Sequence, residues 1–186
     1  YSMIPILIAE NTFKKSGKDS FKQMYVAGGA KILKNDYFKH MIKNLEMVKI
    51  NPPKLKFVPR YPITTILAEE ADIVLSHQWD NPLNYLYLDA LYFGYPLVHN
   101  ANMVQDAGYY YEDFKIFDGV EQLEWALTKH DSHLDEYKRK TQKVLNRYES
   151  TNPKIVEIYK QLIENLWEPN KYKMSYQYNW KTNTYK

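Results

Sequence analysis

The stretch between residues 71 and 100 constrains the fold more than any other part of the chain. Residues 71–76 are apolar almost throughout, as expected of a strand whose sheet is covered on both faces. A helical pattern follows over residues 82–93, with Pro82 at its first position and Gly94 placed to end it. Residues 96–99 predict a second buried strand. A strand, a helix and a strand in this order indicate a parallel α/β sheet.

The flanking segments continue the alternation of helices and strands. The pattern predicts further strands over 23–27, 55–58 and 108–111, and helices over 3–15, 36–47, 63–70, 120–128, 134–148 and 153–167. We therefore expect an α/β fold with a Rossmann-like, mostly parallel sheet of about five strands and helices on both faces. Residues 1–167 are expected to form this domain. Residues 168–186 are polar and aromatic without a period, and are expected to form a C-terminal tail.

Composition excludes several classes of function. The net charge is only +3, from 25 basic and 22 acidic residues, and no basic stripe indicates a nucleic-acid partner. The absence of cysteine excludes a disulfide framework and thiolate-held zinc. No apolar run reaches the roughly 18 residues of a membrane span, and we expect a cytoplasmic protein. The 18 tyrosines either suit a carbohydrate or nucleotide pocket or reflect the composition of the lineage.

Polar residues follow the predicted strands at their carboxyl ends, where ligands bind in open α/β sheets. Taken strand by strand, they are His77, Asp80 and Asn81; His99 and Asn100; Pro59 and Arg60; and Gly28 with Gly29. The free N–H groups at the predicted start of the helix at Pro82 could hold a phosphate near Leu83 and Asn84. Asp89 lies away from the apolar stripe of that helix, where its carboxylate could accept two ribose hydroxyls.

Each of these residues also has a purely structural interpretation. Asp89 and Arg60 could be solvated surface residues, and Asn81 could only cap a helix. Both histidines, His77 and His99, could be satisfied inside the fold. The two glycines lack a following G-x-G-x-x-G pattern and could form a plain turn. The segment 130–133, which contains two histidines, is expected to cap neighbouring helices rather than to bind a metal.

The order of residues from Ala71 to Asn100 resembles the nucleotide-binding domain of GT-B glycosyltransferases. In that domain an Ala-Asp-apolar strand precedes a helix with two glutamates separated by seven residues, then a Gly-x-Pro and a buried strand. Here Ala71 and Asp72 begin the strand, residues 94–96 read Gly-Tyr-Pro, and the two glutamate positions fall on Asn81 and Asp89. The chain is also similar, over nearly its whole length, to a poorly characterised microbial family of glycosyltransferase-like proteins.

The resemblance implies transfer of a sugar from a nucleotide-activated donor to a glycan or other acceptor, without a metal or another cofactor. It assigns the donor ribose to Asp89 and the donor sugar to Asn81, helped by Asp80. Pro82, Leu83 and Asn84 would meet the diphosphate, and the turn with Pro59 and Arg60 would flank the base. We further expect His77 and His99 to border the donor sugar or the diphosphate, and Asn100 to lie with them.

Two departures from the GT-B pattern leave other functions open. The first is that Asn81 has an amide where the GT-B pattern has a carboxylate. The second is that the sequence contains no segment that resembles the acceptor domain. The first strand of the nucleotide-binding domain, which the resemblance implies before the helix predicted over residues 3–15, is not recognised either. The first alternative is a non-catalytic module that binds a nucleotide or glycan. The second is another α/β enzyme, such as a nucleotide-sugar epimerase.

Overall fold

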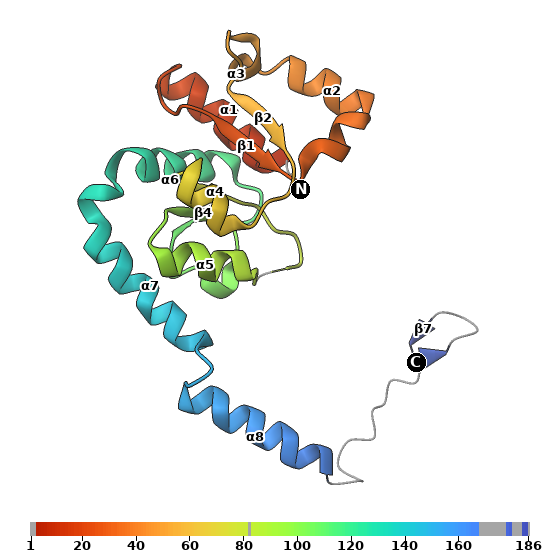
Figure 1. Ribbon diagram of the computed structural model, residues 1–186, viewed down its shortest axis with the longest axis vertical. Coiled ribbons are helices and arrows are strands. Elements are labelled where there is room, and N and C mark those ends of the chain that lie inside the picture. Colours follow the sequence, from red (N-terminus) through yellow and green to blue (C-terminus); the bar gives the residue numbers. More distant parts are fainter. Residues whose placement is uncertain (1–2, 82, 168–177, 180–183, 186) are drawn as a thin grey trace. The chain divides into compact units, whose positions relative to one another are not determined.

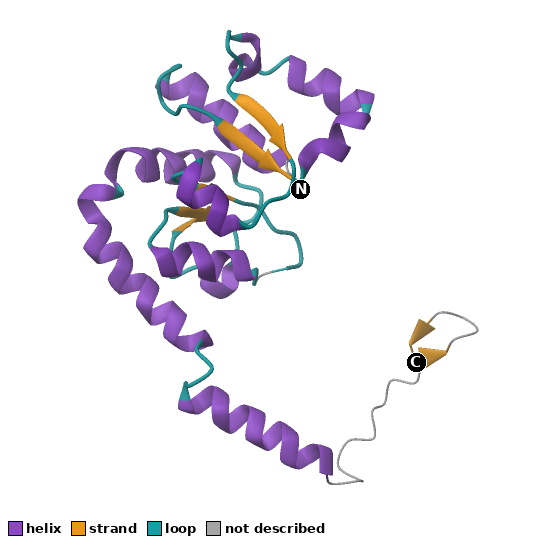
Figure 2. Ribbon diagram, in the orientation of Figure 1, coloured by secondary structure: helices purple, strands orange, loops and turns teal. Residues whose placement is uncertain are grey.

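Helices and short strands alternate along the computed structural model, which describes residues 3–81, 83–167, 178–179 and 184–185 (Figure 1, Figure 2). The chain divides into two compact units, residues 1–145 and residues 146–186. The sequence predicted a boundary after residue 167. The α-helices that begin before the boundary are α1 (Met3–Ser16), α2 (Asp36–Lys43), α3 (Glu46–Lys49), α4 (Ile63–Glu69), α5 (Tyr85–Phe93), α6 (Ile116–Lys129) and α7 (Leu134–Tyr148), which crosses it. The strands are β1 (Met24–Ala27), β2 (Leu55–Val58), β3 (Val74–Leu75), β4 (Leu97–His99) and β5 (Tyr109–Tyr110).

These five strands pair in parallel, but they form two sheets rather than one. β1 pairs with β2 in the register that places Ala27 opposite Val58. β4 lies between β3 and β5, with His99 opposite Tyr110. The α/β class with parallel strands is therefore confirmed. The expected single sheet is not found, because no ladder of backbone hydrogen bonds joins β1 to β3 in the described part of the chain.

The packing of the first unit centres on β4 and on α1. Helices α5 and α6 both contact β4, and Figure 1 shows β4 between them. Leu97 and Val98 of β4 are fully buried, together with Tyr87 of α5. A second apolar cluster joins α1 to the β1–β2 sheet; its buried members are Ile6, Ala9, Phe13, Val26, Phe38, Ile42, Leu45, Met47 and Leu55. Each small sheet thus has its own covering helices.

Helix α5 begins three residues later than the sequence predicted. Its N-cap is Asn84, whose side-chain oxygen accepts a hydrogen bond from the Leu86 N–H at 3.1 Å. The helix therefore begins after the capping asparagine and not at the proline, because the asparagine side chain satisfies an N–H that the helix leaves free. Pro82 itself lies outside the described residues. The C-terminus agrees with the prediction: Gly94 ends the helix in the left-handed conformation, with φ of 78°.

The single helix predicted over residues 36–47 is interrupted. The side chain of Asn44 donates to the His40 carbonyl at 2.9 Å, where α2 ends. The carboxylate of Glu10, from α1, then accepts the N–H groups of Glu46 at 2.8 Å and of Met47 at 3.1 Å. A continuous helix would bond these N–H groups to carbonyls one turn earlier. A long-range acceptor therefore starts α3 afresh.

Other boundaries differ by less. The strand predicted over 71–76 is shorter in the structure, where β3 is limited by its partner β4, which has only three residues. The N–H groups of Val74 and Ser76 still donate to the carbonyls of Pro96 and Val98, both at 2.9 Å. The helix predicted over 120–128 starts earlier, at Ile116. The sequence did not predict the short 3-10 helices at Gly29–Lys34, Asn102–Val104 and Asp131–His133.

The second unit, residues 146–186, contains α8 (Pro153–Trp167) and the antiparallel pair β6 (Tyr178–Asn179) and β7 (Thr184–Tyr185). α8 has the predicted bounds. Most of the predicted C-terminal tail lies outside the described residues. Within the described ranges, no helix has both the length and the apolar character needed to cross a membrane.

Candidate functional site

The hydroxyl of Tyr111 organises the carboxyl end of β3. Tyr111 directly follows β5 and is 1% exposed. Its hydroxyl donates to the Ser76 carbonyl at 2.9 Å and lies 3.2 Å from Nδ1 of His77. A phenol has one proton, and here the carbonyl receives it. The Tyr111 oxygen must therefore accept from His77, which puts the imidazole proton on Nδ1.

The same proton count leaves Nε2 of His77 as an unprotonated nitrogen. His77 is 5% exposed, and its Nε2 is buried without a hydrogen-bond partner in the described part of the chain. Burial lowers the pKa of His77, so the ring is neutral at pH 7. A buried acceptor without a donor is uncommon in a folded protein. This atom can accept a hydrogen bond, or a proton, from a bound hydroxyl.

Two aromatic side chains stand beside His77. The ring centroid of Phe114 lies 4.7 Å from that of His77, and the Trp79 centroid lies 5.1 Å from Phe114. Trp79 and Phe114 are each about half exposed, so their faces can stack on a ligand. Large amphipathic rings of this kind are suited to a sugar or a nucleobase.

Strained backbone flanks the aromatic pair. Asp80 and Asp113, in the loops after β3 and β5, have φ of 50° and 45°, and no other non-glycine residue in the described ranges has a positive φ. Asp80 accepts a hydrogen bond from the Trp79 indole N–H at 2.9 Å. Such strain occurs preferentially at ligand sites. The positive φ angles of Asp80 and Asp113 thus indicate a ligand site in the same loops as the unpaired His77 nitrogen.

Asn100 fixes the loop that contains these residues. Its side-chain oxygen accepts the Gln78 N–H at 2.7 Å, and its amide donates to the Gln78 carbonyl at 2.8 Å. The loop after β3 is thereby tied to the end of β4. The sequence placed Asn100 among ligand-binding residues, but here both polar atoms of its side chain serve the backbone of the loop.

His99 is fully buried and satisfied inside the fold. Its Nδ1 accepts the Ala101 N–H at 3.1 Å, so its Nε2 bears the proton that goes to the Ala107 carbonyl at 2.9 Å. Burial lowers the pKa of His99, which keeps it neutral. Of the two histidines predicted to border a ligand, only His77 has a nitrogen free to do so.

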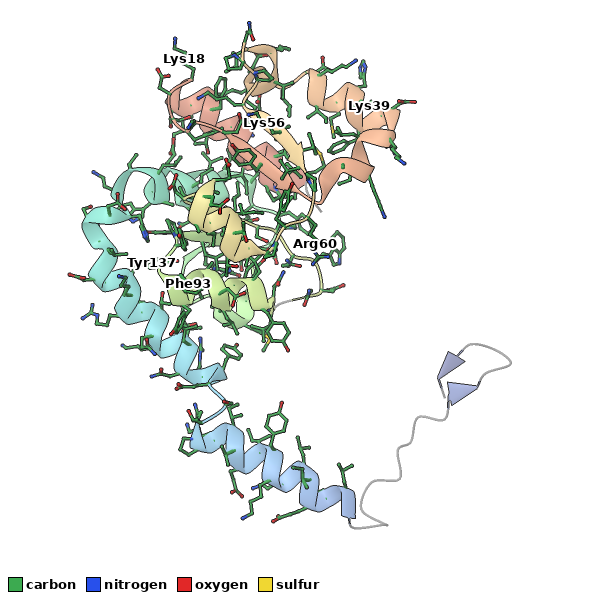
Figure 3. The ribbon with its side chains drawn as sticks, viewed as in Figure 1. Lys18, Lys39, Lys56, Arg60, Phe93 and Tyr137 are labelled. Carbon is green, nitrogen blue, oxygen red and sulfur yellow. The ribbon has the colours of Figure 1, made fainter. Side chains whose placement is uncertain are left out.

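Within the described ranges, the remaining predicted residues make no hydrogen bond, ion pair or ring contact with this cluster. Asn81 is exposed, beyond Asp80 in the loop. Asp89 is exposed on α5, on the face opposite the buried Tyr87 and Leu91. The predicted phosphate site at the helix start changes, because α5 begins at Tyr85 and the oxygen of Asn84 already caps it; Leu83 lies before the helix and is partly buried. Pro59 and Arg60 are exposed after β2 (Figure 3).

Residues 1–163 match a protein family described as proteins of unknown function, DUF2827. The chain belongs to this family. No curated protein and no solved structure matches it. The part shared with the DUF2827 family contains every residue of the cluster described above, from His77 to Phe114.

Tyr111, Asp113 and Phe114 of this DUF2827 chain were not recognised from the sequence as site residues. Tyr111 is the last residue of the strand predicted over 108–111, and Asp113 and Phe114 follow it, so the rule that selected His77 and Asn100 applies to this strand end equally. The sequence predicts all three tyrosines at 109–111 within the strand, and nothing in the pattern distinguishes Tyr111 from the other two.

The side chain of His130 does not cap a neighbouring helix as predicted, but joins β5 to the residue that ends α5. Nδ1 of His130 lies 2.8 Å from the Tyr109 hydroxyl, and Nε2 lies 3.2 Å from the Gly94 carbonyl, where α6 ends. Tyr137 of α7, labelled in Figure 3, packs against the ring and donates to the Tyr95 carbonyl at 2.8 Å. No cluster of three potential metal ligands occurs within the described ranges.

Three buried histidines make stability depend on pH. Burial lowers the pKa of His77, His99 and His130 below the ordinary value of 6.5. The unfolded chain therefore binds protons that the folded chain excludes, and the stabilisation present above pH 6.5 is lost as the pH falls below it. The slope approaches about 1.4 kcal/mol per pH unit for each histidine. Denaturant unfolding at about pH 7.5, 6.5 and 5.5 measures this; an unfolding free energy that stays constant over the range contradicts it.

Proposed function

We propose that this chain is the donor-binding domain of a GT-B glycosyltransferase. The donor, a nucleotide-activated sugar, binds at the carboxyl ends of β3 and β5. The buried, unpaired Nε2 of His77 is the observation that carries the proposal. The resemblance of residues 71–100 to GT-B domains supplies the chemical class of the ligand, and the α/β fold with parallel strands is compatible with it.

The neighbours of His77 match the parts of such a donor. The half-exposed rings of Trp79 and Phe114 offer a stacking surface for a sugar ring or a base. Asp80 brings a carboxylate next to them, which can accept hydrogen bonds from sugar hydroxyls. Nε2 of His77 accepts a further hydroxyl proton. Together they provide apolar contact area and directed acceptors, as expected of a carbohydrate site.

The proposed reaction moves one glycosyl group. The bond between the anomeric carbon and the diphosphate oxygen breaks, and the electron pair leaves with the nucleoside diphosphate. A bond forms between the anomeric carbon and an acceptor hydroxyl, whose proton must be removed. His77 is neutral because burial lowers its pKa, and we assign the removal of that proton to its Nε2 lone pair.

Ligand-induced stabilisation tests the proposal. Thermal unfolding is followed with UDP, GDP, ADP, CMP and dTDP and with their sugar conjugates. At about 100 times its dissociation constant, a ligand stabilises the fold by about 2.7 kcal/mol, which raises the Tm of a domain of this size by roughly 5–10 °C. We expect this shift with one base. His77→Ala should reduce it and His133→Ala, at an exposed histidine between α6 and α7, should retain it.

The possible outcomes separate the alternatives. The absence of a shift with every nucleotide and conjugate contradicts the proposal, as does an undiminished shift in His77→Ala. Binding without release of nucleoside diphosphate, in the presence of glycan acceptors, favours the non-catalytic module. Conversion of the free donor without an acceptor favours an epimerase.

Asp89 has its own test, because its predicted contact with the ribose is separate from the His77 cluster. Asp89→Ala is compared with Asp135→Ala, which removes another exposed helical carboxylate. If Asp89 holds the ribose, only the first variant loses the nucleotide-dependent rise in Tm. Equal shifts in the two variants would make Asp89 a solvated surface residue.

A further inference from the structure

Acidic side chains gather in the two segments beside His77, which are residues 76–81 after β3 and residues 111–118 after β5. We call these segments the acidic loops. Their charged side chains are four carboxylates and one ammonium, all of them exposed: Asp80, Glu112, Asp113, Asp118 and Lys115. With His77 neutral, the formal net charge of the acidic loops is −3, whereas the other 24 basic and 18 acidic residues of the chain give +6. A negative charge thus distinguishes these strand ends from the rest of the chain.

Side-chain contacts bring the acidic loops together. The ring centroid of Phe114 lies 4.7 Å from that of His77 and 5.1 Å from that of Trp79. Asp80 accepts the indole N–H of Trp79 at 2.9 Å, and Asp113 directly precedes Phe114 in the chain. Asp80 and Asp113, one from each loop, therefore flank the same pair of half-exposed rings.

The ammonium of Lys115 does not neutralise the acidic loops. It forms an ion pair with Glu112. The hydrogen bond and the charge of Glu112 raise the pKa of Lys115, and the charges of Asp118 and Asp113 raise it further. Burial raises the pKa of Tyr110 in β5, and the charges of Glu112 and Asp113 raise it further. Both shifts have the direction that an excess of negative charge produces.

The polar groups of this cluster are suited to a ligand that donates hydrogen bonds. Ionised carboxylates only accept hydrogen bonds. The unprotonated Nε2 of His77 is buried without a partner in the described ranges, in a side chain that is 5% exposed, and such an atom indicates a place for a ligand. A phosphate group also accepts and is negative, so it does not complement these groups. An ammonium group has three N–H donors, no acceptor and a positive charge, so it does.

The two rings favour the same charge on the ligand. Trp79 and Phe114 stand at an interplanar angle of 71° and are each about half exposed. A cation within about 6 Å of an aromatic face is attracted by the negative potential of the π system, most strongly by that of tryptophan. A neutral sugar ring also stacks on such faces, but it has no charge to pair with the carboxylates. Rings and carboxylates together therefore select a cation.

We propose that the sugar bound at this cluster is an amino sugar with a free, protonated amine. This assignment rests on the proposed donor site and names the sugar of that site, so the donor is a nucleotide-linked amino sugar. Its ammonium lies against the faces of Trp79 and Phe114, with Asp80 and Asp113 as counter-ions. The diphosphate of the donor lies outside the acidic loops, and His77 borders the sugar rather than the diphosphate.

An ammonium at this position is compatible with the proposed role of His77. It donates its hydrogen bonds to the carboxylates, which leaves Nε2 for a hydroxyl group. A positive charge nearby also disfavours protonation of the imidazole, so it lowers the pKa of His77 in the same direction as burial does. The lone pair of Nε2 thereby stays available at neutral pH.

Free sugars test the charge of the ligand without a nucleotide. Glucosamine, N-acetylglucosamine and glucose have the same ring, and only the first has an ammonium; isomers of glucosamine with the amine on other carbons vary its position. Each sugar is titrated into the chain at neutral pH, and binding is followed through the amide resonances in NMR spectra. We expect at least one amino sugar to bind about tenfold or more tightly than glucose and N-acetylglucosamine. Its resonance shifts should fall on residues 77–80 and 111–114.

Asparagine substitutions remove the charges with little change of shape. Asp80→Asn and Asp113→Asn are suitable because asparagine tolerates the positive φ of both positions. Each variant should bind the amino sugar about fivefold more weakly, which corresponds to the loss of one exposed ion pair. The matched control is Asp135→Asn, at an exposed carboxylate of α7, and it should bind the amino sugar as the unmodified chain does.

The outcomes separate this inference from the proposed function. Equal affinities for amino, N-acetylated and neutral sugars would overturn it, and so would the absence of binding by every sugar. Undiminished binding in both Asp80→Asn and Asp113→Asn would overturn it as well. A preference for the amine without any nucleotide-dependent rise in Tm would contradict only the donor-binding function. A nucleotide-dependent rise that His77→Ala abolishes, without a preference for the amine, would contradict only the amino sugar.

Discussion

Replacing Gly108 with alanine is expected to lower the free energy of unfolding by about 3 kcal/mol. Gly108 precedes β5 and has φ of 69°, a conformation that costs an alanine about 1–2 kcal/mol. A Cβ there would also lie 2.7 Å from the Leu97 carbonyl oxygen and 2.9 Å from Nε2 of His99. Neither atom can move freely, because one belongs to β4 and the other donates to the Ala107 carbonyl.

Gly17→Ala separates the two contributions. Gly17 also has a positive φ, of 86°, but an added Cβ would meet nothing within 4 Å. This control should therefore lose only the strain, about 1 kcal/mol. Chemical denaturation of both variants gives the comparison. Equal losses at the two positions would contradict the expected clash of the added Cβ with Leu97 and His99.

The parts of the fold that local pattern determines were predictable. α7 and α8 have the predicted bounds at both ends, and α1 differs by one residue at its end. Strong helical periods explain this, helped by Pro153 at the start of α8 and Gly17 after α1. β2 also has the predicted bounds, because Pro52 and Pro53 stop any helix before it.

The parts that depend on distant partners were not predictable. The sequence cannot tell whether His77 or His99 is satisfied, since the difference lies in the proton of Tyr111 and the carbonyl of Ala107. Tyr111 is 34 residues from His77 in the chain. The division into two sheets is equally invisible to local pattern, because β1 and β3 each have an ordinary strand sequence. Long-range pairing, rather than propensity, decides both features.

Glu10 illustrates the same limit and gives the second large effect. It lies within α1 and is 1% exposed. Its carboxylate accepts the N–H groups of Glu46 and Met47 at the start of α3, and forms an ion pair with Lys14 at 3.0 Å. In the sequence it is one acidic residue in an apolar helix. Its partners in α3 are 36 and 37 residues away.

Replacing Glu10 with alanine is expected to cost about 3 kcal/mol of unfolding free energy. The buried Met47 N–H and the partly buried Glu46 N–H would lose their acceptor, at about 1–3 kcal/mol for each group left unsatisfied. Glu10→Gln keeps one oxygen but turns an amide toward an N–H, so its loss should be intermediate. Urea unfolding of both variants measures the difference.

Lys14→Met is the matched control, because it removes the ion pair and leaves both bonds to α3. Lys14 is about half exposed, and an exposed ion pair contributes at most about 1 kcal/mol. A loss in Lys14→Met as large as in Glu10→Ala would mean that charge pairing, not the capping of α3, explains why an acid is buried there. A small loss in Lys14→Met beside a large one in Glu10→Ala assigns the stabilisation to the two backbone hydrogen bonds. In that case Glu10 is the residue that divides the predicted helix over 36–47 into α2 and α3.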